Sequence, residues 1–264
     1  MPRISITTLE EARACERPPG FTGNVATQAL FRHDDDPIFV HLHTFGPGSN
    51  LRIGPIDSDC IAYVWKGAVD AGGRLLRASS SLVVEHGATA EIHGRDAHSL
   101  LLTFAAARAP ATQRDGGHVH LLPTERVPRT DALAGSRGVG GGMHANAECP
   151  SCEIWLHENS FAAPDVEPSL ANIEKGVHSH SEDEVIFVTD GQMRVGNRLY
   201  GPGTALAIAA ETFYSFAVGP DGLKFINFRP ARPSEIKVKN GPSIDEVAYW
   251  HDRIAVPEYL PPLF

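Results

Sequence analysis

Short runs of Val, Ile, Leu and Phe recur along most of the chain and are broken by Gly, Pro or Asp about every 8–12 residues. This spacing is typical of an all-β sandwich or barrel, because each run suits one strand and is too short for most helices. The expected strands cover residues 37–45, 60–65, 81–85, 99–104, 152–158, 184–189, 192–195, 204–208, 213–218 and 223–228. Two capping boxes, Thr8 with Glu11 and Ser243 with Glu246, predict short helices over 8–16 and 243–253.

The two halves of the chain repeat this pattern at a constant offset of 124 residues. Without a gap, residues 63–67, 74–75 and 100–104 match residues 187–191, 198–199 and 224–228 in turns and apolar positions. A constant offset over such a length indicates a duplicated β domain. We therefore expect an N-terminal domain over 1–112, a flexible linker over 113–145 that contains the glycine run 138–142, and a C-terminal domain over 146–264.

Composition supports this organisation and narrows the possible partners. The 264 residues include 25 Gly and 20 Pro, which favours many turns and few long helices. A net charge of −9 argues against a nucleic-acid partner, and no apolar stretch reaches the roughly 18 residues that a membrane span needs. The first residues do not resemble a signal peptide, and four Cys are too few for a disulfide framework, so we expect a cytoplasmic protein.

The second half carries a set of metal-ligating residue types. His178, His180 and Glu184 share the same parity, so on extended chain their side chains project from one face of the sheet. Two imidazoles and one carboxylate form a ligand set that suits a divalent transition metal and can leave coordination positions open. A turn glycine, Gly191, follows at a fixed distance. We expect the metal ligands to be His178, His180 and Glu184.

This pattern, H-x-H-x3-E-x6-G, resembles the first motif of the cupin superfamily. The second motif, G-x5-P-x-G-x2-H-x3-N, keeps only Gly203. The departures are Asn172 before the first motif, and Ala209, Glu211, Tyr214 and Val218 in the second. With two copies, the resemblance is to the bicupins over about residues 40 to 230. It implies two tandem barrels of the jelly-roll type, also called a double-stranded β-helix, with short flanking helices.

The two copies differ at the positions where cupins hold a metal. Tyr214 stands where the family has its fourth ligand, and two roles stay open for it: metal ligand, if the metal draws off its proton, or a hydrogen-bonding and proton-donating group of the cavity. At the offset of 124, the first copy has Gly54, Ile56, Cys60 and Ala90 at the four ligand places. The resemblance therefore implies a metal in the C-terminal barrel alone.

The leading functional hypothesis is a metal-dependent enzyme. One divalent transition metal (Fe, Mn, Ni or Zn) would act on a small oxygen-rich organic molecule, by dioxygenase-type oxidation or by metal-assisted isomerisation or hydrolysis. Two alternatives stay open: a non-catalytic bicupin that binds or senses a small molecule, and a structural protein with a vestigial site. The expected partner is a small molecule rather than nucleic acid or membrane, and a homodimer is also left open.

Other candidates have simpler interpretations. Cys149 and Cys152 form a C-x-x-C pair with only His144 nearby, so we interpret them as incidental thiols, with metal or redox chemistry as the alternative. The H-x-H pair at His118 and His120 has no Glu at the required distance and is placed on an inter-domain strand.

Several polar residues are candidates for lining a cavity. His43 and His157 match between the copies, which favours a structural role. Glu153 and Trp155 share a strand face with His157 and are expected to line the second cavity with it. Arg194 and Arg198 are the remaining candidates, for pairing with a substrate carboxylate.

Overall fold

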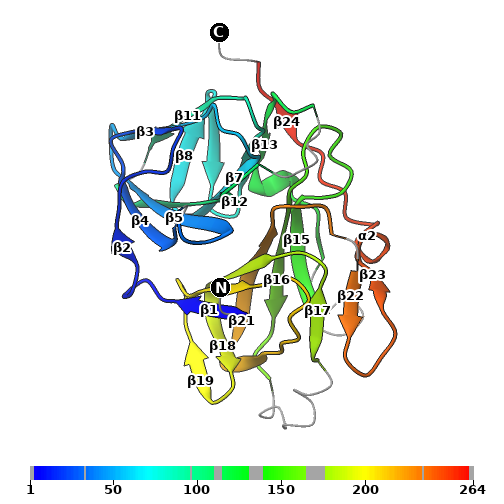
Figure 1. Cartoon of the computed structure of the whole chain (residues 1–264). Helices are drawn as coiled ribbons and strands as arrows, with labels where there is room; N and C mark the ends of the chain where they lie inside the picture. The colour runs from blue at the N-terminus through cyan, green and yellow to red at the C-terminus, as the bar shows by residue number, and fades with distance from the viewer. Residues whose placement is uncertain are drawn as a thin grey trace. The chain divides into compact units, whose positions relative to one another are not determined.

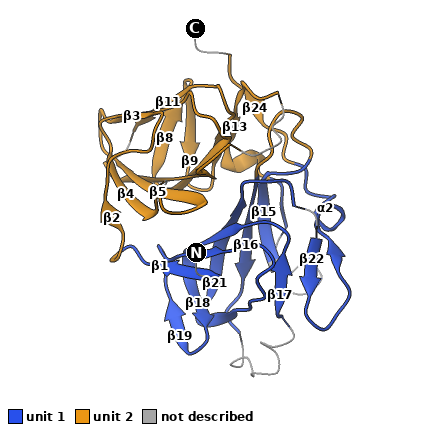
Figure 2. Cartoon of the chain, viewed as in Figure 1, with its two compact units in different colours: residues 1–9, 128–147, 155–254 blue, residues 10–127, 148–154, 255–264 orange. Residues whose placement is uncertain are grey.

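The computed structural model describes residues 3–32, 34–95, 97–109, 115–130, 139–164, 176–233 and 235–261. Figure 1 shows a chain made almost entirely of strands, as the all-β prediction requires. The chain divides into two compact units (Figure 2). The unit of residues 10–127, 148–154 and 255–264 is called the N-terminal barrel below, and the unit of residues 1–9, 128–147 and 155–254 the C-terminal barrel.

The N-terminal barrel contains two antiparallel sheets. Its larger sheet has the order β2-β4-β5-β12-β7-β10-β13-β24, and its smaller sheet has the order β3-β6-β11-β8-β9. The larger sheet consists of β2 (Arg13–Ala14), β4 (Ala26–Phe31), β5 (Ile38–Phe45), β12 (Ser99–Ala106), β7 (Cys60–Lys66), β10 (Ser81–Val84), β13 (Val119–Leu122) and β24 (Glu258–Tyr259). The smaller sheet consists of β3 (Phe21–Gly23), β6 (Asn50–Ile53), β11 (Ala90–Gly94), β8 (Ala68–Ala71) and β9 (Arg74–Arg77). A 3-10 turn, η1 (Thr124–Arg126), follows β13.

The C-terminal barrel repeats this plan. Its main sheet has the order β1-β20-β18-β21-β16-β15-β14, with β19 paired to β18, and a three-stranded sheet has the order β17-β22-β23. The main sheet consists of β1 (Ile4–Thr7), β20 (Ala205–Ile208), β18 (Glu184–Val195), β21 (Ala217–Arg229), β16 (Trp155–Phe161), β15 (Val139–Ala145), β14 (Arg129–Thr130) and β19 (Arg198–Tyr200). The small sheet consists of β17 (His178–His180), β22 (Glu235–Val238) and β23 (Ile244–Asp245), and the helix α2 (Glu246–Tyr249) follows β23.

Each barrel has an apolar interior built from alternate strand positions. In the N-terminal barrel this core includes Phe45, Leu51, Val64 and Ile92, all at most 1% exposed. In the C-terminal barrel, Ile186, Val188 and Leu206 belong to the corresponding cluster. Strands β7 and β18 begin 124 residues apart, as do β10 and β20, so the sequence repeat is a structural repeat.

Two expected helices differ from the structure. The helix expected over 8–16 is wrong: the chain makes a turn at 9–11 and then the strand β2, which pairs with β4. The helix expected over 243–253 is shortened to the four residues of α2. Its N-cap is Asp245, whose side chain accepts a hydrogen bond from the Ala248 amide, instead of Ser243. Glu246 cannot complete the expected capping box because its side chain is buried inside the barrel.

The expected linker also contains ordered strands. Strand β13 lies within it, and most of the glycine run 138–142 forms β15, which pairs with β16. Gly141 has φ +152°, and a Cβ atom there would collide with the carbonyl oxygen of Glu158 on β16. A glycine at this position therefore permits close strand pairing; Gly138 lies outside the described residues.

The compact units divide the chain differently from the expected boundaries at 112 and 146. Strand β1 pairs with β20 in the C-terminal barrel, although it lies at the start of the chain. Residues 148–154 and β24 belong to the N-terminal barrel, where β24 pairs with β13. No helix in the described part of the chain is long and apolar enough to cross a membrane.

Candidate metal centre

Strands β17 and β18 position the predicted ligands in the C-terminal barrel. His178 and His180 are the first and last residues of β17, and Glu184 is the first residue of β18. Strand β17 is held in place by pairing with β22 and by a two-way backbone bridge between His178 and Tyr214. The structure therefore gathers His180, Glu184 and Tyr214 as buried side chains, exposed by 6%, 1% and 9%.

His180 is oriented by a carboxylate that sequence reasoning missed. Its Nδ1 lies 3.3 Å from Oε2 of Glu246, and its Nε2 lies 3.7 Å from Oε2 of Glu184. A carboxylate on one ring nitrogen fixes the tautomer and leaves the other nitrogen as an acceptor, which is the usual arrangement around metal-bound histidines. Glu246 therefore directs the lone pair of His180 Nε2 toward Glu184.

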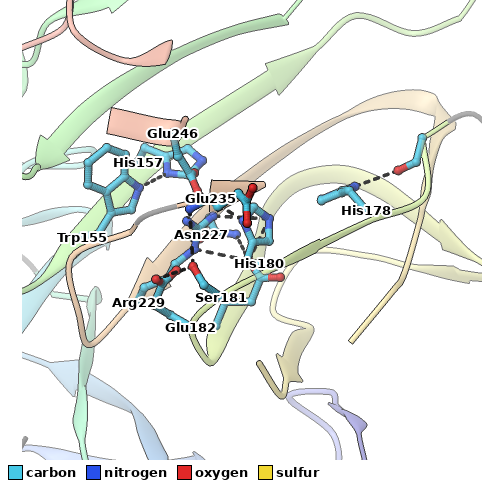
Figure 3. Close-up of polar contacts among 12 residues, drawn as sticks. Trp155, His157, His178, His180, Ser181, Glu182, Asn227, Arg229, Glu235 and Glu246 are labelled. Atoms are coloured by element: carbon cyan, nitrogen blue, oxygen red, sulfur yellow. Dashed lines mark hydrogen bonds and ion pairs between the residues drawn. The ribbon is translucent and has the colours of Figure 1, made fainter. Parts of the chain in front are cut away.

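A buried arginine joins the same cluster (Figure 3). Arg229, at the end of β21, is 1% exposed and forms an ion pair with Glu246. Its Nε lies 3.7 Å from Glu184 Oε2, and its Nη2 lies 3.4 Å from His180 Nε2. Burial alone would raise the pKa of Glu246, but the Arg229 guanidinium and the hydrogen bond with His180 hold that pKa far below its ordinary value. Glu246 is therefore a stable carboxylate.

Glu184 has one engaged oxygen and one unengaged oxygen. Asn227 Nδ2 donates a hydrogen bond to Glu184 Oε2 at 2.6 Å. Glu184 Oε1 is buried and has no hydrogen-bond partner among the described residues. Burial and the negative charge of Glu184 together raise the pKa of Tyr214 well above its ordinary value of 10. The Tyr214 phenol therefore keeps its proton at neutral pH.

His178 stands apart from this group. Its Nδ1 lies 2.7 Å from the carbonyl oxygen of Gly176, and Figure 3 shows the ring directed toward that carbonyl. The His178 ring centroid is 5.1 Å from that of His180 and 4.7 Å from that of Tyr214. Burial lowers the pKa of His178, so the ring is neutral and its Nε2 is an acceptor. The four predicted side chains are neighbours, but Figure 3 shows His178 directed toward the Gly176 carbonyl, and the described residues His178, His180 and Glu184 do not bring one ligand atom each within 4.8 Å of one another.

Sequence reasoning missed Asn227, Arg229 and Glu246. A signal existed for the first two: they are polar residues of one parity near the end of the apolar run 223–228, where the first copy has Thr103 and Ala105. Glu246 gave a misleading signal, because its spacing from Ser243 matches a capping box.

A histidine and two tryptophans lie beside the cluster. Trp155 Nε1 donates a hydrogen bond to His157 Nδ1 at 2.8 Å, and the His157 ring lies 4.8 Å from that of Trp250. Burial and the charge of Arg229 lower the pKa of His157 to about 3, so it is neutral. Trp155 and His157 share a face as expected, whereas Glu153 belongs to the N-terminal barrel.

The N-terminal barrel has no such cluster at the matching place. Cys60, at the position of Glu184, is fully buried, and burial raises its thiol pKa. His43 lies 3.0 Å from both Thr27 Oγ1 and Thr103 Oγ1, which satisfies both ring nitrogens. Strand pairing shows that the counterpart of His157 is His41. Asn227 faces His157 across the C-terminal sheet, and Thr103, which aligns with Asn227 at the offset of 124, faces His41. His43 is therefore not the match.

The remaining candidates fall elsewhere. Arg194 and Arg198 lie on β18 and β19, at the end of β18 away from Glu184, so they are outside this cluster. Cys149 and Cys152 form a disulfide, so the interpretation as incidental thiols is wrong. His144 lies 3.2 Å from Glu158 in the C-terminal barrel, away from those cysteines. His118 is exposed, with its ring 5.7 Å from that of Tyr259.

Comparison with known proteins gives the fold a family context. No family model and no curated protein matches the sequence. Among solved structures, the chain is similar to YlbA from E. coli, with a TM-score of 0.63, 14% identity, and coverage of 86% of this chain and 90% of that one. A proposed dioxygenase from Nostoc punctiforme has a TM-score of 0.63, 12% identity, and coverage of 100% of this chain and 89% of that one. For oxalate decarboxylase from Lactobacillus farciminis the TM-score is 0.60, the identity 11%, and the coverage 94% of this chain and 90% of that one.

The chain has the bicupin fold. The resemblance suggested by the His178, His180 and Glu184 motif is thereby confirmed for the architecture of two tandem barrels. At these identities a bicupin fold does not define a reaction, because unrelated functions share it.

Proposed function

We propose that this bicupin is a metal-dependent enzyme. One divalent transition metal would bind in the C-terminal barrel to His178, His180 and Glu184 and act on a small oxygen-rich organic molecule. The observation that carries the proposal concerns two atoms of the cluster. His180 Nε2 lies 3.7 Å from Glu184 Oε2, and the other oxygen of that carboxylate, Oε1, is buried with no hydrogen-bond partner among the described residues. Proteins of the same fold include oxalate decarboxylases, one of which contains Mn(II) centres, and a proposed dioxygenase.

The charges of the cluster also fit a cation. Two buried carboxylates, Glu184 and Glu246, face one buried guanidinium, Arg229. These three side chains therefore carry one negative charge that has no positive partner among them. An unmatched buried charge is costly. Nitrogen and oxygen donors with one carboxylate suit Fe, Mn, Ni or Zn. The residues fit a divalent ion in their chemistry and charge, with His178 as the ligand that is directed elsewhere.

The protein's own side chains would have distinct roles in such a site. The metal, when bound, supplies Lewis-acid or redox chemistry. Arg229 holds Glu246, and Glu246 orients His180, so both are positioning residues. Tyr214 retains its proton and would donate a hydrogen bond to a substrate oxygen in such a site. We assign Tyr214 to this role rather than to metal ligation.

Metal content of the purified full-length protein tests the proposal. The C-terminal barrel of the wild type should hold about one equivalent of metal per chain. His180→Ala and Glu184→Gln should each remove that equivalent. Cys60→Ala, at the matching position of the N-terminal barrel, is the control and should retain it. Iron would favour oxygenation and zinc would favour isomerisation or hydrolysis. Equal metal content in all four proteins would overturn the proposal.

A second candidate function is non-catalytic binding of a small molecule. It is favoured by the position of Arg229 Nη2, which lies 3.4 Å from His180 Nε2 and places the protein's own cation against that nitrogen. A site of this kind would hold no metal and would use Arg229 and Tyr214 to bind an anionic ligand. A ligand that raises the unfolding temperature of metal-free protein without forming a product would support this function.

A further inference from the structure

A second group of metal-ligating side chains lies in the N-terminal barrel. Glu85 directly follows β10, His120 lies on β13, and Cys149 and Cys152 lie in the segment 148–154. One ligand atom from each of the four lies within 4.8 Å of the others. Glu85, Cys152 and His120 are buried, with exposures of 0%, 3% and 5%. The group does not depend on the proposed metal centre of the C-terminal barrel.

Strand pairing and two hydrogen bonds fix the Glu85 carboxylate. Strands β10 and β13 are antiparallel neighbours in which Val83 faces His120, so Glu85 emerges beside β13. The His118 amide donates to Glu85 Oε2 at 3.0 Å, and Ser151 Oγ donates to Glu85 Oε1 at 2.6 Å. Hydrogen bonds of this kind orient metal-binding carboxylates.

The distances approach those of a tetrahedral zinc site. His120 Nε2 lies 3.4 Å from Glu85 Oε1, and Cys149 Sγ lies 4.0 Å from the same oxygen. With Zn–N and Zn–O bonds of about 2.0 Å and Zn–S bonds of about 2.3 Å, tetrahedral geometry separates the donor atoms by about 3.3–3.8 Å. The nitrogen and oxygen already have this separation, and the sulfur is a few tenths of an ångström beyond it.

The histidine gives an independent indication of a ligand. His120 Nε2 is buried and has no hydrogen-bond partner among the described residues, although it faces a carboxylate oxygen. A nitrogen and a carboxylate oxygen at this distance fit either an imidazole that carries a hydrogen on Nε2 or a metal ion bound to both atoms. The two cysteines beside the pair favour the metal.

We propose that Glu85, His120, Cys149 and Cys152 form a zinc site when the two cysteines are reduced. The structure shows these cysteines as a disulfide, which cannot supply thiolate ligands. An external thiol or phosphine reductant transfers two electrons to the S–S bond, and two protons complete the two thiols. Binding of Zn²⁺ then releases the two thiol protons to solvent. Oxidation of the pair closes the disulfide and excludes the metal.

Four protein ligands leave no open position, so this zinc would be structural. It would connect the segment 148–154 to β10 and β13 within the N-terminal barrel. Such a site makes zinc retention by this barrel dependent on the thiol state of Cys149 and Cys152.

Metal binding to the full-length His180→Ala variant tests the proposal, because this background removes the metal proposed for the C-terminal barrel. After reduction with a phosphine and removal of metals, the protein should bind one equivalent of Zn²⁺. Co²⁺ in place of zinc should give the intense visible absorption of tetrahedral thiolate coordination. The oxidised protein should bind less than a tenth of an equivalent. Adding Cys152→Ser or His120→Ala should abolish the cobalt spectrum, and Ser151→Ala should weaken zinc binding about 10- to 100-fold.

Cys15→Ser is the matched control, because Cys15 is a free cysteine of the same barrel, and it should leave zinc binding unchanged. The cobalt spectrum of the reduced parent protein needs no further variant, so misfolding of a cysteine variant does not hide the result. Equal zinc binding by the reduced and oxidised proteins, or a cobalt spectrum without thiolate character, would overturn the proposal. Neither outcome bears on the proposed function, which concerns the other barrel.

Discussion

Removal of the Arg229 guanidinium should destabilise the C-terminal barrel strongly. In Arg229→Met, the apolar part of the side chain stays, but Glu184 and Glu246 become two buried carboxylates without their cation. Breaking a buried ion pair in this way costs about 3–5 kcal/mol. For proteins of about 150–250 residues, 1 kcal/mol corresponds to about 2–4 °C, so the unfolding temperature should fall by at least about 6–20 °C. Thermal unfolding followed by circular dichroism at neutral pH measures this shift.

An exposed ion pair supplies the control for Arg229→Met. Lys237 Nζ lies 2.7 Å from Glu211 Oε2, but the two side chains are 40% and 53% exposed. Lys237→Met should therefore cost less than about 1 kcal/mol. The double variant Arg229→Met/Glu246→Gln should lose less stability than the two single variants together, because it removes both charges. A loss in Arg229→Met no larger than that in Lys237→Met would refute the assignment of Arg229 as a buried counter-ion.

Three further expectations concern other parts of the chain. Burial lowers the pKa of His43 from 6.5 to about 3, so its contribution to stability is complete above pH 6.5 and is lost as the pH falls toward 3. Between pH 7.5 and pH 5 the free energy of unfolding of the wild type, measured in urea, should therefore fall by about 2 kcal/mol. His43→Gln should not show this fall. The same pH dependence in both proteins would contradict the expectation. Gly141→Ala should lower the unfolding temperature by several degrees, because its Cβ would collide with the Glu158 carbonyl on β16; a neutral effect would contradict the described pairing. Leu260 packs against the core of the N-terminal barrel, so Leu260→Ala should cost about 1–2 kcal/mol in urea unfolding, and no loss would show that this packing is unimportant.

The sequence predicted the architecture well because strand rhythm and duplication are properties of long stretches. The offset of 124 residues correctly aligned β7 with β18 and β10 with β20. Local signals for the ends of helices predicted the structure less well. The capping box at Thr8 and Glu11 did not form a helix, because the neighbouring residues pair as strands in β1 and β2. Tertiary pairing overrode a local preference.

The candidate sites show the same division between local and long-range information. Parity on an extended chain predicted His180 beside Glu184, and the two side chains do lie close, although a bend at residues 181–182 separates β17 from β18. It could not identify Glu246, which is 66 residues from His180 and reaches it only through the fold. The cluster in the N-terminal barrel depends on a similarly long-range contact, since Cys149 and Glu85 are 64 residues apart. Contacts between residues so far apart in the chain produce no periodic pattern in a single sequence.

Anomalous X-ray scattering from crystals of the native protein tests the central claim most directly. The account predicts an anomalous peak in the C-terminal barrel, within bonding distance of His180 Nε2 and a carboxylate oxygen of Glu184, with the His178 ring turned toward it. The absorption edge of the peak would identify the metal. A C-terminal barrel with no peak, in which the guanidinium of Arg229 fills the space between His180 and Glu184, would contradict the account.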